Sequence, residues 1–140
     1  MKYLHTAVRV NDLDKALAFY QGVMGLEEQH RFRGHRRPCT IVFLAAPGDA
    51  QAQIELVHYD DPEERARTLG FSHVAYEVEN IYATCAEWLA KGAEIPMPPS
   101  DGFMAFVRCP DGVAVELLQK GGALPPEEPW ASMPISGEWQ

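Results

Sequence analysis

The sequence predicts an α+β fold in which two paired β-α-β-β-β modules form a curved mixed sheet around a cavity. The chain has 140 residues with 46% hydrophobic content, which suits one compact domain with a real core. One pattern, running from a histidine to a glutamate, is present twice. We therefore place a single domain at residues 1–120, with module one at 1–60 and module two at 70–120, and a Pro/Gly-rich tail at 121–140.

The internal repeat is visible when the two halves are aligned. The segment "HTAVRVNDLDKALAFYQGVMGLE" matches "HVAYEVENIYATCAEWLAKGAE" with one gap, so that Val10 meets Val78. Downstream, "APGDAQAQIELV" matches "CPDGVAVELL" after an insertion in the first copy, which places Glu55 opposite Glu116. Each half thus begins with a histidine and ends with a glutamate.

The first strand and helix of each module follow from hydrophobic spacing. "LHTAVRV" alternates in polarity, so His5, Ala7 and Arg9 share the face opposite the apolar one. Asn11 and Asp12 are good helix caps, and apolar residues then recur at helical spacing as far as Gly25. The second module repeats this scheme from residue 73 to residue 92, and its histidine also faces away from the helix.

The remaining strands are shorter apolar runs separated by Gly and Pro. They are "TIVFLAA" and "AQIELVHY" in module one, and "GFMAFVRCPDG" and "VAVELLQ" in module two. The strand after each helix, near 27–32 and 94–96, has the weakest pattern. Val115 and Leu117 flank Glu116 and occupy the helix-covered face, so Glu116 points to the other face; for Glu55 the alternation is less decisive. A carboxylate there is costly to bury without a partner.

Four side chains of metal-ligand type therefore occupy equivalent positions in the two modules. They converge on one cavity if the two half-sheets face each other. A lone strand histidine or glutamate usually has a structural role, but the paired arrangement in both copies favours a metal site. Two imidazoles and two carboxylates suit zinc, nickel, cobalt, iron or manganese, with positions left for water or substrate. The four residues are His5, Glu55, His73 and Glu116.

Composition excludes several classes of protein. Twenty acidic and twelve basic residues give a net charge of −8, which disfavours nucleic acid as a partner. No apolar run reaches the roughly 20 residues of a membrane span, and the N-terminus lacks the apolar stretch of a signal peptide. We therefore expect a soluble cytoplasmic protein without a membrane partner. The three cysteines contain no C-x-x-C pair, which predicts reduced, mostly buried thiols.

The segments "LHTAVRVNDLDKALAFY", "GVMGLE", "IEL", "SHVAYEV", "CPDG" and "VEL" carry a family resemblance over roughly residues 1–120. The chain resembles the vicinal oxygen chelate superfamily, and most closely its bacterial glyoxalase I (lactoylglutathione lyase) branch. That resemblance implies a homodimer and a divalent ion, with nickel, cobalt or zinc preferred. It also implies that His5, Glu55, His73 and Glu116 are the metal ligands, in the order found in the family.

The activity implied by the resemblance is a metal-dependent lyase reaction on a small molecule. The hemithioacetal of methylglyoxal and glutathione would be isomerised to S-lactoylglutathione through an ene-diolate. By matched position Glu116 is the base, and Glu55 is a ligand that shares proton handling. Arg9 lies on the same strand face as His5, and the matching arginine of the family binds a glutathione carboxylate.

Two departures from the family pattern weaken the case for glutathione. Tyr59 stands where the bacterial enzymes usually carry an asparagine, and the loop "PMPPSDGF" contains Asp101 but no lysine or arginine. Alternative functions are an epimerase, an antibiotic thiol transferase or an iron dioxygenase on the same scaffold. A non-catalytic protein that sequesters a small ligand is the alternative from another class.

Two segments lie outside this scheme. The run "HRFRGHRRPC" concentrates four arginines, which either bind an anionic group or form a solvated loop. The tail is rich in Pro and Gly but contains Trp130 and Trp139, so we expect part of it to dock on the domain or on a second subunit.

Overall fold

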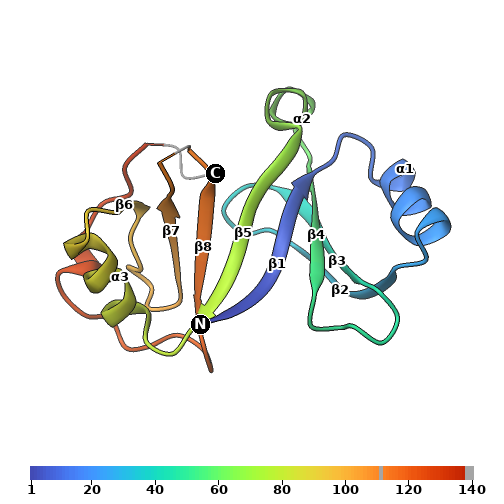
Figure 1. The fold of residues 1–140 in the computed structure, drawn as a ribbon. Helices are drawn as coiled ribbons and strands as arrows, with labels where there is room; N and C mark the ends of the chain where they lie inside the picture. The colour runs from blue at the N-terminus through green and yellow to red at the C-terminus, as the bar shows by residue number, and fades with distance from the viewer. Residues whose placement is uncertain (111, 138–140) are drawn as a thin grey trace. The chain divides into compact units, whose positions relative to one another are not determined.

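The computed structural model describes residues 1–110 and 112–137 (Figure 1). The chain divides into two compact units. The N-terminal unit contains Leu4–Ser72, and the C-terminal unit contains Met1–Tyr3 and the chain from His73 onward. Both units combine strands that pair in parallel and antiparallel directions with few helices, which confirms the predicted α+β class.

The N-terminal unit has the predicted β-α-β-β-β order. Strand β1 (Lys2–Arg9), which belongs to this unit from Leu4 onward, is followed by helix α1 (Leu13–Leu17), which continues as the π-helix η1 (Ala18–Val23). Strands β2 (Glu27–Arg33), β3 (Cys39–Ala45) and β4 (Gln53–Tyr59) complete the unit in the order β2-β3-β4-β1. The β1–β4 pair is parallel, whereas β2–β3 and β3–β4 are antiparallel.

Local chemistry explains where the first helix begins and ends. The Asp12 side chain accepts a hydrogen bond from the backbone N–H of Lys15 at 3.0 Å, which caps the first turn. Gly25 follows η1 with a φ of 77°, a left-handed conformation that glycine adopts without steric cost. The predicted helix is therefore present, although its second half has π-helical rather than α-helical geometry.

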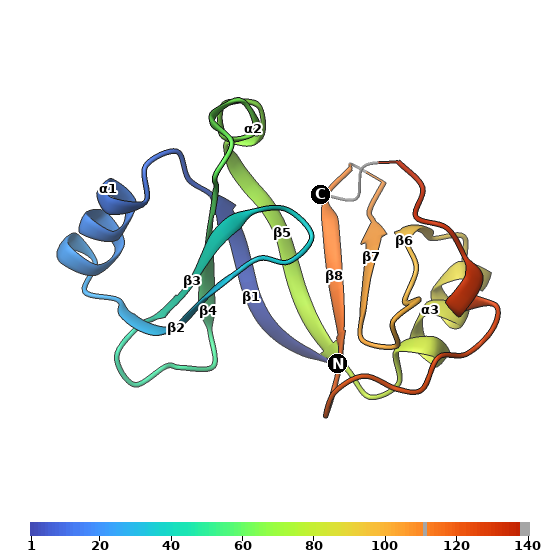
Figure 2. The ribbon, with the colours of Figure 1, turned by 180° about the vertical axis from the view of Figure 1, so that it is seen from behind.

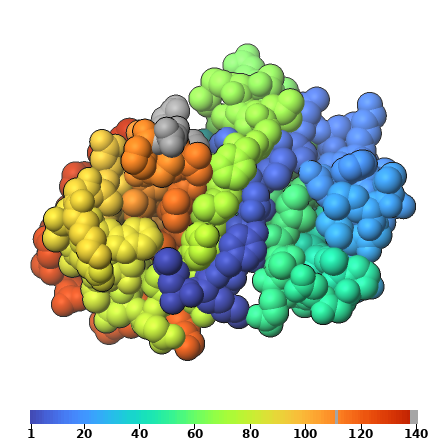
Figure 3. Space-filling model, viewed as in Figure 1, coloured from blue at the N-terminus to red at the C-terminus, as the bar shows by residue number. Residues whose placement is uncertain are grey.

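The helix covers one face of this four-stranded sheet (Figure 2). Val42, Leu44 and Leu56 are fully buried under it and form the core of the unit together with apolar residues of α1 and η1. The outer surface of α1 and η1 stays exposed and is visible in blue in the space-filling view (Figure 3). Because strand side chains alternate, Phe43 and Glu55 point to the face that the helix does not cover.

Helix α2 (Pro62–Thr68) lies between the two predicted modules, where the sequence interpretation placed no helix. Its residues are mostly charged, so no apolar periodicity marks it. Asp61 caps it by accepting a hydrogen bond from the N–H of Glu63 at 2.9 Å, and proline occupies the first helical position. The capping residues were thus the available sequence signal.

The C-terminal unit repeats the same order of elements. It contains β5 (Gly70–Val78) from His73 onward, α3 (Ile81–Ala90), β6 (Glu94–Met97), β7 (Met104–Arg108) and β8 (Ala114–Gln119), arranged as β5-β8-β7-β6. The Asn80 side chain caps α3 by accepting from the N–H of Ala83 at 3.0 Å. Ile81, Cys85 and Leu117 are fully buried between α3 and the sheet.

The tail docks on the C-terminal unit. Trp130, in the short 3-10 helix η2 (Trp130–Ser132), is 5% exposed and belongs to the core under α3. The N–H of Leu124 donates to the carbonyl of Gly102 at 3.0 Å, and the Tyr82 hydroxyl donates to the carbonyl of Pro125 at 2.8 Å. Trp139 lies outside the described residues. The tail is therefore part of this unit's packing.

The sequence predicted reduced, mostly buried thiols and no membrane-spanning segment. Cys39 and Cys85 are buried, Cys109 is partly exposed, and all three are free. Burial raises the pKa of the Cys85 thiol to about 12, so this thiol is protonated at neutral pH. In the described part of the chain, no helix has the length and apolar character needed to cross a membrane.

Candidate metal centre

The N-terminal unit brings His5 and Glu55 together on the face opposite its helix. Strands β1 and β4 run parallel with Ala7 opposite Glu55, so His5 lies two residues before the partner of Glu55. His5 Nε2 is 2.6 Å from Glu55 Oε2. The two residues are 5% and 7% exposed. The strand register, rather than proximity in sequence, makes this pair.

The C-terminal unit builds the same pair from β5 and β8. These strands are also parallel, with Ala75 opposite Glu116, so His73 again lies two residues before the partner of the glutamate. His73 Nε2 is 3.2 Å from Glu116 Oε2. The residues are 3% and 8% exposed. Each unit therefore contains one buried histidine–glutamate pair in the same register.

A phenylalanine ring contacts the histidine of each pair. The sequence interpretation did not predict this contact. Phe43 of β3 is the cross-strand partner of Glu55, and its ring meets the His5 ring edge-on, with centroids 5.0 Å apart at 79°. Phe106 of β7 is the partner of Glu116. It meets His73 in the same way, at 5.3 Å and 85°. The repeat was the available signal, because both phenylalanines occupy the strand before the glutamate strand.

The chemistry of each histidine–glutamate pair suits a divalent cation. Buried carboxylates are costly unless a positive charge or hydrogen-bond donors offset their desolvation. Imidazole nitrogen and carboxylate oxygen together form a borderline donor set that zinc, nickel, cobalt and iron accept. The buried candidates for binding such an ion are His5, Glu55, His73 and Glu116.

Arg9, expected to bind substrate, lies half-buried at the end of β1 on the same face as His5. Its Nη2 donates to the carbonyl of Phe71 at 2.6 Å. Its Nε is buried and has no hydrogen-bond partner among the described residues. The guanidinium is thus held from one side, and its Nε–H has no acceptor among residues 1–110 and 112–137.

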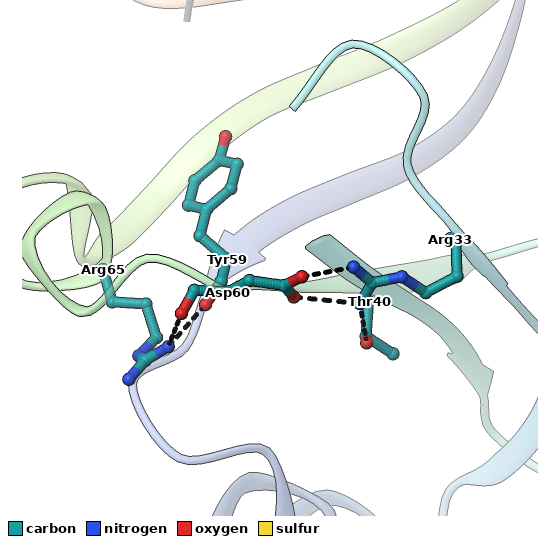
Figure 4. Close-up of polar contacts among 5 residues, drawn as sticks. All are labelled: Arg33, Thr40, Tyr59, Asp60 and Arg65. Carbon is teal, nitrogen blue, oxygen red and sulfur yellow. Dashed lines mark hydrogen bonds and ion pairs between the residues drawn. The ribbon is translucent and has the colours of Figure 1, made fainter. Parts of the chain in front are cut away.

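Tyr59 lies at the end of β4, on the same strand face as Glu55, and is 4% exposed. Burial raises the pKa of its phenol, and the cations of Arg37 and Arg9 oppose that increase. Arg65 donates to the carbonyl of Tyr59 at 2.6 Å and to the carbonyl of Asp60 at 2.9 Å. Figure 4 shows the Tyr59 ring pointing away from these contacts.

The arginine-rich run forms ion pairs within the N-terminal unit. Arg33 pairs with Asp60 and also donates to the Thr40 hydroxyl at 2.9 Å (Figure 4). Its guanidinium lowers the pKa of the Asp60 carboxyl through a hydrogen bond. Arg37 Nη1 lies 2.8 Å from Glu64 Oε1. These contacts favour a solvated, ion-paired segment, but residues 30–33 of the run lie in strand β2 rather than in the predicted loop.

Asp101, in the loop that departs from the family pattern, has a structural contact. Its Oδ1 accepts hydrogen bonds from the N–H of Phe103 at 2.9 Å and the N–H of Met104 at 3.0 Å. These bonds shape the turn that leads into β7.

A comparison with known protein families places the chain in one of them. The model of the Glyoxalase/Bleomycin resistance protein/Dioxygenase superfamily matches residues 2–117. The chain therefore belongs to this superfamily, as the sequence segments predicted.

The chain is similar in sequence to bacterial proteins named lactoylglutathione lyase or probable lactoylglutathione lyase. It is 32% identical over 125 residues to lactoylglutathione lyase of Haemophilus influenzae, covering 85% of this chain and 93% of that protein. It is 36% identical over 124 residues to a probable lactoylglutathione lyase of Vibrio cholerae, covering 84% of this chain and 90% of that protein.

Solved structures share the fold at lower identity. A hypothetical protein of Bacillus halodurans matches with a TM-score of 0.72 and 22% identity, covering 89% of this chain and 97% of that one. Methylmalonyl-CoA epimerase of Mycobacterium tuberculosis matches with a TM-score of 0.68 and 23% identity, covering 94% and 92%. At this identity the likeness concerns the fold alone.

Proposed function

We propose that the two histidine–glutamate pairs together bind one divalent ion and that the protein is a glyoxalase I-like lyase. The observation that carries this proposal is the repetition of one register in both units, with histidine two residues before the partner of a buried glutamate. Membership of the superfamily and the names of the relatives support it. The proposed ligands are His5, Glu55, His73 and Glu116, and the preferred ions are nickel, cobalt and zinc.

The proposed reaction isomerises the hemithioacetal of methylglyoxal and a thiol such as glutathione. The bound ion would supply Lewis-acid polarisation of the two neighbouring oxygens of the substrate. Glu116 removes the proton from the carbon that bears the hydroxyl and sulfur, which gives an ene-diolate. The proton then returns to the adjacent carbon, and the hydroxyl proton of the hemithioacetal moves to the former carbonyl oxygen, so that the product is the 2-hydroxy thioester S-lactoylglutathione. Glu55 shares the proton handling.

Burial of the two carboxylates supports this role. Glu55 and Glu116 are 7% and 8% exposed, so bulk water competes little for the transferred proton. One oxygen of each carboxylate also lies near an imidazole nitrogen of its own unit, at 2.6 Å for Glu55 and 3.2 Å for Glu116. A general base held in this way needs little reorganisation during the reaction.

Arg9 is the proposed contact for an anionic group of the substrate. Its Nε has no hydrogen-bond partner in the described part of the chain, and it shares a strand face with His5. The proposed anionic group is a carboxylate of glutathione. Tyr59 stands where the bacterial enzymes usually carry an asparagine.

We also propose that the protein acts as a cytoplasmic homodimer, which sedimentation and cell fractionation would test.

The decisive experiment is a thioester-formation assay on purified protein reconstituted separately with nickel, cobalt and zinc. Methylglyoxal is supplied with glutathione, with another thiol, or with no thiol. The expected result is that thioester forms only when a thiol is present. If thioester forms with another thiol but not with glutathione, that thiol replaces glutathione as the proposed substrate. Absence of turnover under every condition would contradict the proposal. Oxygen uptake with iron would indicate the dioxygenase chemistry of the superfamily instead.

Two variants test the residues. Glu116→Gln should lower kcat by at least about 100-fold because the base is lost. His73→Ala should remove most of the bound metal, as measured by elemental analysis. The matched control is His58→Ala, a partly exposed histidine on β4 whose side chain alternates with that of Glu55. Unchanged metal content in His73→Ala would contradict the ligand assignment.

A further inference from the structure

We propose that Phe43 and Phe106 are matched positioning residues that fix the orientation of the two histidine ligands. This inference rests on the proposed function, because it concerns the binding of its metal ion. Its basis is that both units contain the same three-residue arrangement of histidine, glutamate and phenylalanine.

In the N-terminal unit, Phe43 lies on the sheet face opposite the helix. It alternates along β3 with Val42 and Leu44, which form the helix-side core. Its ring forms a T-shaped pair with the ring of His5, with centroids 5.0 Å apart at 79°, and its backbone is opposite Glu55. Phe43 therefore touches the histidine and neighbours the glutamate of the same pair.

The C-terminal unit has the same arrangement with Phe106. The ring is 2% exposed and meets His73 at 5.3 Å and 85°, and Glu116 is its cross-strand partner. The same contact occurs in both halves of the repeat, which makes a chance packing contact a poor explanation. What the two occurrences share is contact with an imidazole that needs a defined orientation.

A flat ring can provide this orientation. The second side-chain torsion of histidine has a broad, shallow energy profile, so packing decides where Nε2 points. Edge-to-face aromatic pairs have a preferred geometry and contribute beyond their buried area. Groups that orient a metal-bound histidine from outside the ligand set affect metal affinity strongly. A branched aliphatic side chain fills similar space but leaves the imidazole free to rotate.

Each phenylalanine is itself supported from behind. The ring of His30 stacks on Phe43 with centroids 4.4 Å apart at 16°. Phe106 packs in a buried cluster with Met97 and Ala114. Neither ring can therefore tilt easily, and each transmits a fixed direction to the imidazole that it contacts.

The test compares Phe43→Leu and Phe106→Leu with the wild-type protein by calorimetric titration of nickel. We expect each variant to bind nickel about tenfold more weakly, with Phe→Tyr at the same positions restoring affinity to within about threefold. The absorption spectrum of the cobalt-loaded protein should also change, because it reports ligand geometry. A purely structural contribution would lower stability without altering that spectrum.

Matched controls separate ring loss from loss of the contact. Phe19→Leu removes an exposed ring of η1 in the N-terminal unit, and Phe103→Leu removes an exposed ring in the C-terminal unit. Neither control should change nickel affinity by more than about twofold. Wild-type affinity and cobalt spectrum in both Phe→Leu variants, or equal losses in the controls, would overturn this inference alone. Failure of the wild-type protein to bind any metal would overturn the proposed function and this inference together.

Discussion

Replacing Trp130 with alanine should strongly destabilise the C-terminal unit. The indole is 5% exposed and packs with Ile81, Cys85 and Leu117 under α3. Truncation of a buried tryptophan removes its transfer free energy and leaves a cavity, which together cost about 3–5 kcal/mol. For a chain of this length, such a loss lowers the melting temperature by roughly 10–15 °C.

The measurement is urea unfolding followed by far-ultraviolet circular dichroism, which does not depend on the lost fluorophore. Trp130→Phe is the control, because a smaller ring keeps most of the apolar contact and should lose about half as much stability. Deleting residues after Lys120 should cost at least as much as the alanine variant. A loss below about 1 kcal/mol for Trp130→Ala would refute the conclusion that the tail is part of this core.

Three further outcomes are expected. Gly102→Ala should destabilise the protein by about 2 kcal/mol or more, because φ is 73° at this residue and an added Cβ would lie 2.2 Å from the carbonyl oxygen of Leu124. An unchanged free energy of unfolding would contradict the contact between Gly102 and Leu124 of the tail. Arg33→Ala should raise the pKa of Asp60 in an NMR titration. Because that pKa is lowered in the folded state, the pair stabilises the fold above the unfolded pKa of Asp60 and loses this contribution as the pH falls through the folded pKa. Alkylation of the native protein should label Cys109 before the two buried thiols, as peptide mass spectrometry would show.

The repeat in the sequence was sufficient to predict much of the architecture and the candidate ligands. Strand alternation predicted that His5 lies on the face away from the helix. The apolar neighbours Val115 and Leu117 predicted the same for Glu116. These predictions succeeded because side-chain direction in a strand is a local property with a period of two residues. Glu55 was harder to place, since apolar residues stand on both of its strand faces.

Tertiary structure decided the features that depend on which strands are neighbours. The contacts of Phe43 and Phe106 with the histidines arise from cross-strand register, which no single strand encodes. Docking of Trp130 likewise depends on a surface formed by α3 and the sheet, far away in sequence. The sequence by itself determined the modules and the residue types of the site, because these follow from local periodicity and repetition. Only folding determined what surrounds each ligand, because that depends on packing between segments distant along the chain.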